Sequence, residues 1–248
     1  MLRDRERTGG TPSGPLVGWV VDVQNDFMLP PEDGGRLYVA DPADPADEGA
    51  EAVRPAIEAA VAWMRDHCDA LVFTGDWHGY DDEEIDPDDP DPAAGTYPPH
   101  CMGRSDDPAE RAGAEILVSV RPHDPVILDR DADADEARRA ARLAVEERRP
   151  VWIRKNRFDV FRGNPLTDVF VEALTAALGG DPRFVLAGVA RDVCVTQAVD
   201  GLQARGHRTV ALRDATHGLG LESEEETLAR WARGGDVVTL EELRTRLG

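Results

Sequence analysis

Short runs of apolar residues alternate with longer segments of helical periodicity along most of this chain. Such alternation is typical of βαβ units, in which helices connect neighbouring parallel strands. We therefore expect an α/β fold: a three-layer α/β/α doubly wound sheet of about six mainly parallel strands in the order 3-2-1-4-5-6. In chain order, the expected strands are residues 16–23, 70–76, 150–155, 183–189, 207–214 and 235–240.

The segments between these strands divide into helices and loops. Helical spacing of apolar residues predicts helices over 56–67, 135–149, 165–180 and 195–205. The stretch 81–100 is too acidic and too rich in proline for either element, so we expect a long surface loop, while 115–130 fits a pair of short edge strands. We expect residues 1–15 to be a disordered lead-in and 16–248 to form a single domain.

Composition excludes several classes of function. The chain has 248 residues, of which 41% are hydrophobic and 31% charged, and no apolar run approaches the ~20 residues of a membrane span. Its 49 acidic and 28 basic residues give a net charge of −21, which disfavours a nucleic-acid partner. That charge could steer a cationic substrate, but a solvated acidic surface is the favoured explanation, since net charge bears on solubility before function. Three widely spaced cysteines and the lack of a signal-type stretch favour the cytoplasm.

Three reactive side chains stand where expected strands end. Asp22 closes the first strand, Lys155 closes the third, and Cys194 follows the fourth at the start of a helix. In the expected strand order the first and fourth strands are neighbours, so Asp22 and Cys194 would face each other. The first turn of a helix lowers the pKa of a thiol, and its amides could bind an oxyanion. The residues alone leave two readings open, because most free cysteines pack in cores and an aspartate before a helix is usually a cap.

A second set of residues has the composition of a metal site. Asp76 and His78 follow the second strand in "TGDWH", and His100 follows the acidic loop in "YPPHC". One carboxylate and two imidazoles, with positions left for water, suit one divalent ion, zinc in preference to iron or manganese. The alternative is that each histidine forms ordinary hydrogen bonds in a loop.

Taken together, these segments resemble the isochorismatase-like cysteine hydrolases, and within them the nicotinamidase branch. The similarity extends over residues ~16–240 in order. The segments that carry it are "VDVQNDF" (21–27), "GGRLYV" (34–39), "FTGDWH" (73–78), "YPPHCM" (97–102), "GAEI" (113–116), "WIRKNRFDVF" (152–161) and "GVARDVCVTQAVDGLQARGHRTVALRDA" (188–215).

The resemblance implies a role for each of these residues. Asp22 would be the general base, Lys155 its partner and Cys194 the nucleophile. It implies that Asp76, His78 and His100 are metal ligands and that a cis peptide between Val189 and Ala190 turns amides toward the oxyanion. It also implies a small-molecule amide as substrate, a thioester intermediate and a homo-oligomer.

The substrate pocket departs from the branch at several positions. The resemblance places Phe27, Trp77, Tyr97 and Arg191 around the substrate, with Tyr97 where tryptophan is usual and Arg191 where a small or hydroxyl residue is usual. Glu84 stands where nicotinamidases often have a further histidine. It is either an additional metal ligand or part of the solvated acidic loop.

The leading hypothesis from the sequence is therefore a metal-containing amidohydrolase, with nicotinamide as the best single substrate. The alternatives are hydrolysis of a carbamoyl, ureido or lactam compound on the same fold, a non-catalytic binding module, and a redox-sensing thiol protein that would pair Cys194 with Cys101. No nucleic-acid or membrane partner is expected.

Overall fold

The computed structural model describes residues 14–92 and 94–247. Within these ranges the strands all belong to one parallel sheet with the order β3-β4-β2-β1-β5-β6-β7. The strands are β1 (Leu16–Val21), β2 (Ala70–Asp76), β3 (Val126–Leu128), β4 (Val151–Lys155), β5 (Arg183–Val189), β6 (Arg208–His217) and β7 (Gly235–Val238).

The predicted strand order is present within this sheet, since the six expected strands are β4-β2-β1-β5-β6-β7. The difference is β3, which adds a seventh parallel strand beside β4 in the described part of the chain. The prediction of two edge strands in 115–130 is wrong: residues 126–128 form one strand, while Ile116 makes an isolated bridge with Gln24. An apolar run of three residues is too short for periodicity to identify.

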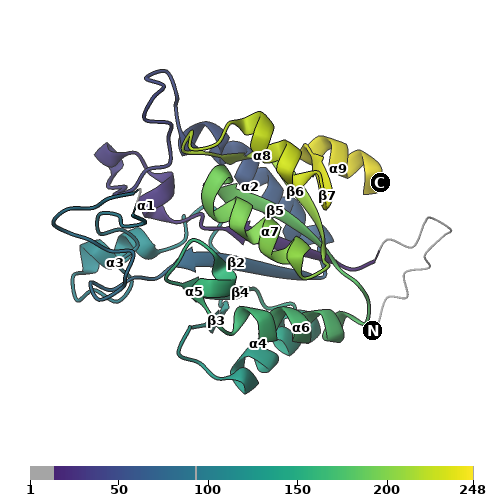
Figure 1. Ribbon diagram of the computed structural model, residues 1–248. Coiled ribbons are helices and arrows are strands. Elements are labelled where there is room, and N and C mark those ends of the chain that lie inside the picture. The colour runs from purple at the N-terminus through teal and green to yellow at the C-terminus, as the bar shows by residue number, and fades with distance from the viewer. Residues whose placement is uncertain (1–13, 93, 248) are drawn as a thin grey trace.

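Helices cover both faces of the sheet, with α2 on one side and α4 and α6 on the other (Figure 1). They are α1 (Asn25–Met28), α2 (Ala50–His67), α3 (Pro108–Ala114), α4 (Ala134–Glu146), α5 (Val160–Gly163), α6 (Thr167–Leu178), α7 (Thr196–Ala204), α8 (Glu224–Trp231) and α9 (Leu240–Leu247). A 3₁₀ turn spans Pro31–Asp33, and a π-helical turn, Arg191–Val195, leads into α7.

Two apolar cores hold the layers together. Side chains of α2 such as Ile57 and Met64 pack with Phe73 of β2 on one face, and Phe170 of α6 packs with Trp19 of β1 on the other. Because β1, β2 and β5 are covered on both faces, they are buried along almost their whole length and read as continuous apolar runs.

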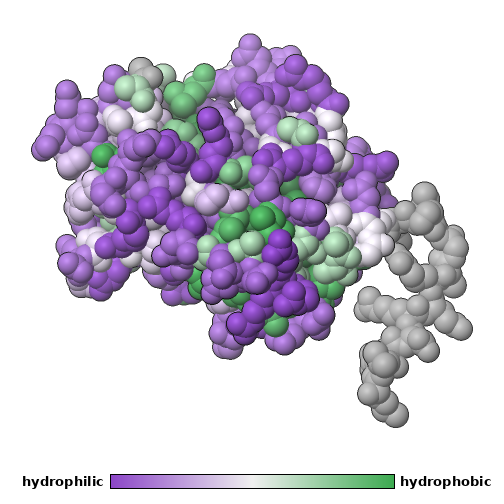
Figure 2. Space-filling view, turned by 60° about the horizontal axis from the view of Figure 1, so that its bottom comes forward, coloured by the Kyte–Doolittle hydropathy of each residue, from purple (hydrophilic) through white to green (hydrophobic). Residues whose placement is uncertain are grey.

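The surface is largely polar. On the face shown in Figure 2 hydrophilic residues predominate, and apolar residues form small patches near the centre and at the upper edge of the view. Among the described helices, none combines the length and the apolar character needed to cross a bilayer. Most of the predicted lead-in, residues 1–13, lies outside the described residues, whereas the carbonyl of Pro15 accepts a hydrogen bond from the Arg183 amide at the start of β5.

Candidate active site

The reactive residues come together because four neighbouring parallel strands end at one edge of the sheet. Asp22 follows β1, Asp76 and Lys155 are the last residues of β2 and β4, and Cys194 follows β5. These strands are adjacent in the order β4-β2-β1-β5. The carboxyl edge of such a sheet is where ligands bind in open α/β folds.

Lys155 connects the group. Its side chain is buried, and its Nζ lies 2.8 Å from Asp22 Oδ2 and 4.0 Å from Cys194 Sγ, and donates a hydrogen bond to Asp76 Oδ1. Burial alone would lower the pKa of Lys155, but the carboxylates of Asp22 and Asp76 raise it well above its ordinary value. The side chain is therefore an ammonium whose charge is balanced by two carboxylates.

Asp22 is held in a conformation that an L-residue seldom adopts. Its φ is +50°, in the left-handed region, and its Oδ1 accepts a hydrogen bond of 2.7 Å from the Thr74 hydroxyl. Burial raises the pKa of Asp22, and the nearby Lys155 opposes that shift. A buried carboxylate with a raised pKa suits a group that must accept and return a proton.

Cys194 is buried in the π-helical turn that precedes α7. Burial raises the pKa of its thiol well above the ordinary value, although Lys155 acts in the opposite direction. Burial is the largest influence on this pKa and opposes the lowering expected from the start of the helix, so activation of the thiol by the helix stays a prediction. The sulfur keeps its proton until a neighbouring base removes it.

The turn between β5 and Cys194 has the geometry that the resemblance implies. The peptide bond between Val189 and Ala190 is cis, and the Ala190 carbonyl accepts hydrogen bonds from the amides of Val193 (3.1 Å) and Val195 (3.0 Å). Ala190 also lines the cavity beside Cys194. The oxyanion role of this turn stays a prediction.

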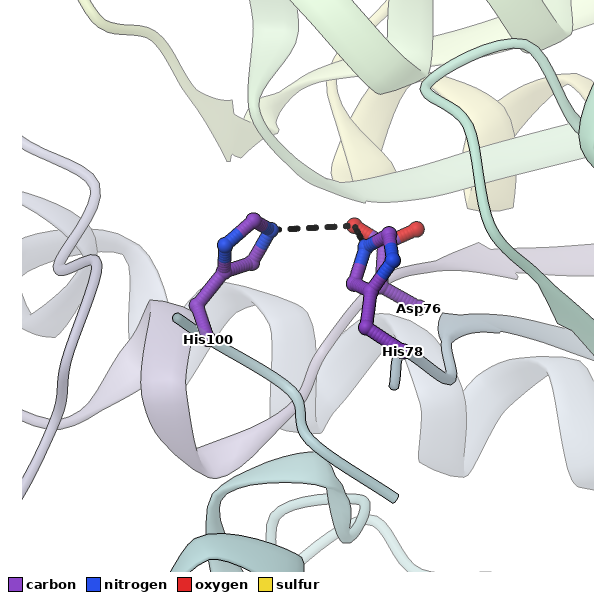
Figure 3. Close-up of side chains that lie close together, drawn as sticks. All are labelled: Asp76, His78 and His100. Carbon is purple, nitrogen blue, oxygen red and sulfur yellow. Dashed lines mark ion pairs between the residues drawn. The ribbon is translucent and has the colours of Figure 1, made fainter. Parts of the chain in front are cut away.

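Asp76, His78 and His100 form a cluster whose ligand atoms lie within 4.8 Å of one another. The Nε2 atoms of both histidines point at Asp76 Oδ2 from 3.9 Å (Figure 3). All three atoms are buried and lack a hydrogen-bond partner among the described residues. Buried polar atoms without partners are costly, so their convergence fits a bound cation.

The outer nitrogens of the two histidines face oxygen atoms. His100 Nδ1 lies 2.8 Å from the Pro98 carbonyl, and His78 Nδ1 lies 3.5 Å from Asp82 Oδ2. Such oxygen neighbours are usual behind metal-bound imidazoles, because they fix the ring with Nε2 free to coordinate. The observed donor set of one carboxylate and two imidazoles thus fits a divalent ion.

Glu84 was predicted to be either an additional metal ligand or a solvated acid, and its surroundings match neither prediction fully. It is buried, so it does not belong to a solvated stretch of the acidic loop, and it is not among the three residues whose ligand atoms converge. Its Oε1 accepts a hydrogen bond of 3.3 Å from the Phe158 amide. Burial and the nearby Asp76 raise the pKa of Glu84 to about 7.

A small apolar cavity of about 30 Å³ adjoins Cys194. Phe27 and Tyr97 line it, as expected, together with Asp76, His100 and several apolar residues, among them Phe158 and Leu219.

Two residues predicted for this pocket lie elsewhere. Trp77 is absent from its lining and instead packs edge-on against Trp152, with the Arg154 guanidinium 3.6 Å from its ring centre. Arg191 pairs with Glu224 of α8 at 3.0 Å. Both residues are close in sequence to residues of the site, but their side chains point away from the cavity, and the sequence does not show that direction.

Sequence reasoning missed Thr74 and Asp82. Thr74 is the one hydroxyl residue in the apolar strand β2, two positions before Asp76, and that spacing places both side chains on the same face. Asp82 is buried and lies behind His78, but it looked like any other residue of the acidic loop.

Comparison with known proteins agrees with this geometry. The isochorismatase domain model matches residues 19–242. The chain belongs to the isochorismatase domain family. No curated protein matches it in sequence.

Solved structures of this family share the fold at low identity. Nicotinamidase/pyrazinamidase from Bacillus subtilis is 19% identical with a TM-score of 0.58, covering 90% of this chain and 99% of its own. Pyrazinamidase of Pyrococcus horikoshii in complex with zinc is 23% identical with a TM-score of 0.58, covering 91% and 100%. N-carbamoylsarcosine amidase from Thermoplasma acidophilum is 22% identical with a TM-score of 0.57, covering 91% and 96%.

Proposed function

We propose that this isochorismatase-family protein is a metal-containing cysteine amidohydrolase that converts nicotinamide to nicotinate and ammonia. The observation that carries the proposal is the position of Lys155, whose ammonium touches Asp22 and Asp76 and lies 4.0 Å from Cys194 Sγ. A nucleophile, a base and a fixed positive charge next to an apolar cavity form the constellation that acyl transfer requires.

The first half of the proposed reaction forms a thioester. Asp22 takes the proton of the Cys194 thiol as the sulfur bonds to the carboxamide carbon, and the carbonyl electrons move to its oxygen. When the oxyanion collapses, the C–N bond breaks and the nitrogen takes the proton from Asp22. Ammonia leaves, and the acyl group stays on Cys194.

The second half restores the enzyme. Water gives a proton to Asp22 and attacks the thioester carbon, and collapse of that intermediate breaks the C–S bond. The sulfur recovers the proton from Asp22, and the product leaves as a carboxylic acid that ionises in water. One water is consumed for each amide bond, and Lys155 keeps a positive charge beside the sulfur throughout.

Asp76, His78 and His100 would hold the metal, for which we favour zinc over iron or manganese. When bound, the ion supplies a Lewis acid that anchors a ring nitrogen of the substrate. We expect about one ion per chain in the purified protein, and loss of most of it in His78→Ala. The matched control is His217→Ala, since His217 pairs with Asp47 outside the cluster. Equal metal content in the two variants would remove the assignment.

The lining of the cavity favours a small uncharged ring over a cationic substrate. Its lining is mainly apolar, and the carboxylate in it, Asp76, already pairs with Lys155. A carbamoyl compound remains the second candidate, because the Thermoplasma acidophilum neighbour is an N-carbamoylsarcosine amidase.

Ammonia release from a panel of amides separates these substrates. The panel contains nicotinamide, pyrazinamide, a carbamoyl amine, a urea and a lactam, and we expect the two ring carboxamides to have the highest kcat/KM. A carbamoyl amine in first place would replace nicotinamide with the second candidate. No turnover of any amide would favour a binding module or a redox-active thiol.

The oligomeric state and the cellular location of the protein are also proposals. We propose a homo-oligomer in the cytoplasm, with a small-molecule amide as its partner and neither nucleic acid nor membrane. Light scattering on the purified protein tests the first point, and a monomer at micromolar concentration would contradict it.

A further inference from the structure

A second cavity, of about 270 Å³, is lined in part by Lys155, whose Nζ lies 4.0 Å from Cys194 Sγ in the wall of the smaller cavity. The walls of the second cavity carry the side chains of Arg104, Arg130 and Arg154, and the ring of Trp77 forms part of the lining. These residues come from the segments at the carboxyl ends of β2, β3 and β4. The cavity therefore lies at the ligand-binding edge of the sheet, yet it shares only Lys155 with the proposed mechanism.

The lining of this cavity is richer in basic residues than the chain as a whole. Four of its lining residues are basic and two, Asp129 and Asp131, are acidic, whereas the whole chain has 28 basic and 49 acidic residues. Lys155 is balanced by Asp22 and Asp76. Each guanidinium also pairs with a carboxylate, Arg104 with Asp81 and Asp82, Arg130 with Asp82 and Arg154 with Asp129, so a ligand would bind through the N–H donors that these pairs leave.

Buried Asp82 organises two of these arginines. Its Oδ2 lies 2.9 Å from Arg104 Nη2, and its Oδ1 lies 3.1 Å from Arg130 Nη1 and accepts a hydrogen bond of 2.8 Å from the Asn156 amide. A guanidinium has five N–H donors. Arg104 also donates to Asp81 through Nη1 and Nη2, so it keeps fewer donors for a ligand than Arg130 does. Asp82 also lies behind His78, which joins this cavity to the proposed metal cluster.

Arg154 is fixed in place by a different kind of contact. Its guanidinium lies 3.6 Å from the centre of the Trp77 ring, and its Nη1 is 3.3 Å from Asp129 Oδ1. Its Nε is buried and has no hydrogen-bond partner among the described residues. A buried donor without a partner is costly, and Arg154 is therefore a residue of this lining with an unmet donor.

We propose that this cavity binds a small oxyanion, the carboxylate or phosphate group of a metabolite, through Arg104, Arg130 and Arg154. Guanidiniums bind both groups through paired, charge-assisted hydrogen bonds, and here they are pre-positioned by Asp82 and Trp77. The site is separate from the one that holds the amide, so the proposal does not depend on which amide is hydrolysed.

Calorimetric titration of the full-length protein tests this site, with inorganic phosphate in one arm and acetate in the other, at constant ionic strength. Arg130→Gln and Arg104→Gln each remove one guanidinium that is about one-third exposed, so the fold should tolerate them. We expect each to weaken binding about tenfold. The matched control is Arg138→Gln, whose side chain is more than half exposed on α4 and pairs with Asp135.

The outcomes separate the alternatives. Binding that is weakened in the two cavity variants and unchanged in Arg138→Gln supports the site, and the stronger arm identifies phosphate or carboxylate as the ligand group. Binding of equal strength in all four proteins would assign the anion to the metal cluster or to general screening and overturn the proposal. Absence of binding in both arms would overturn it too.

Discussion

At the scale of single residues, the site depends on charges that are buried together. Asp22, Asp76 and Lys155 are almost wholly inaccessible, and each carboxylate is satisfied mainly by the same ammonium. Burial of charge is tolerated only with such pairing. A buried group of three charges is weak evidence for stability, and it agrees with the proposed catalytic role of these residues.

Removing the proposed base should reduce turnover without removing the cavity. We expect Asp22→Asn to lower kcat by about 10²- to 10⁴-fold, the usual contribution of a general base.

Thr74→Val, which removes the hydroxyl that donates to Asp22 Oδ1, should lower kcat about tenfold with little change in KM.

The matched control for Thr74→Val is Thr209→Val, since Thr209 is a buried threonine of β6 that hydrogen-bonds to Gln203 outside the site. Steady-state kinetics on the best amide of the panel provide the measurement. Equal kcat in the two threonine variants would show that Thr74 does not position Asp22.

At the scale of elements, the close approach of β1 and β5 places Asp22 near Cys194. Gly188 of β5 pairs with Val21, has a φ of +131°, and a Cβ added to it would lie 2.0 Å from the Val21 carbonyl oxygen. No other residue type fits between these strands at the point where the segments carrying Asp22 and Cys194 begin.

Gly188→Ala should therefore force the two strands apart. We expect a loss of at least about 3 kcal/mol in the free energy of unfolding, measured in urea, together with a fall in activity. Gly206→Ala is the control, because its φ of +84° is also left-handed but an added Cβ meets nothing within 4 Å. It should cost about 1 to 2 kcal/mol, and equal losses in the two variants would contradict the account.

The Asp47–His217 pair joins the segments that follow Val39 and precede Leu219, two residues that line the cavity beside Cys194. Asp47 Oδ2 lies 2.9 Å from His217 Nε2 and accepts a hydrogen bond from the Asp41 amide. Burial alone would raise the pKa of Asp47, but these hydrogen bonds outweigh it and hold the pKa below its ordinary value. The folded protein therefore binds fewer protons at Asp47 in acid than the unfolded chain does.

The contribution of this pair to stability has a defined pH dependence. It should be fully present above pH ~5 and be lost as the pH falls through the lowered pKa of Asp47, below about 4. We expect the unfolding free energy of Asp47→Asn to fall less steeply than that of the wild type between pH ~5 and ~2. Asp66→Asn, at an exposed position of α2, is the control, and wild-type steepness in Asp47→Asn would refute the role of the pair.

At the scale of the whole molecule, the net charge of −21 predicts how stability responds to salt. Self-repulsion opposes the compact state, and the numerous surface ion pairs contribute little each. Raising the ionic strength from ~0.01 to ~0.15 M shortens the screening length from about 30 to about 8 Å. We expect the free energy of unfolding to increase over this range, and a decrease would mean that ion pairs outweigh repulsion.

Most of the architecture could be predicted from the sequence because a parallel sheet buries its strands and leaves continuous apolar runs. Six strands and their order followed from those runs, and the convergence of Asp22, Lys155 and Cys194 followed from the order. The short strand β3 has too few residues to show a pattern. It extends the sheet beside β4, where Arg130 follows it and lines the cavity of arginines.

The directions of side chains in loops could not be predicted in the same way. Trp77 lies next to Asp76 and His78 but turns to Trp152 and Arg154, and Arg191 lies three residues before Cys194 but turns to Glu224. Asp82 looks like a solvated acid in the sequence, and Glu84 could have been either a solvated acid or a metal ligand, but both are buried because the acidic loop folds back against Phe158 and Asn156. Long-range contacts of this kind leave no local periodicity in the chain.

The most direct test of the central claim is ammonia release from the best amide of the panel by Cys194→Ala, measured beside Cys68→Ala. Cys68 is buried at the end of α2, where burial raises the pKa of its thiol to about 12, and it belongs to no site. We predict that Cys194→Ala loses at least about 10³-fold in kcat while still binding metal, and that Cys68→Ala keeps wild-type turnover. Turnover retained in Cys194→Ala would contradict the thioester mechanism.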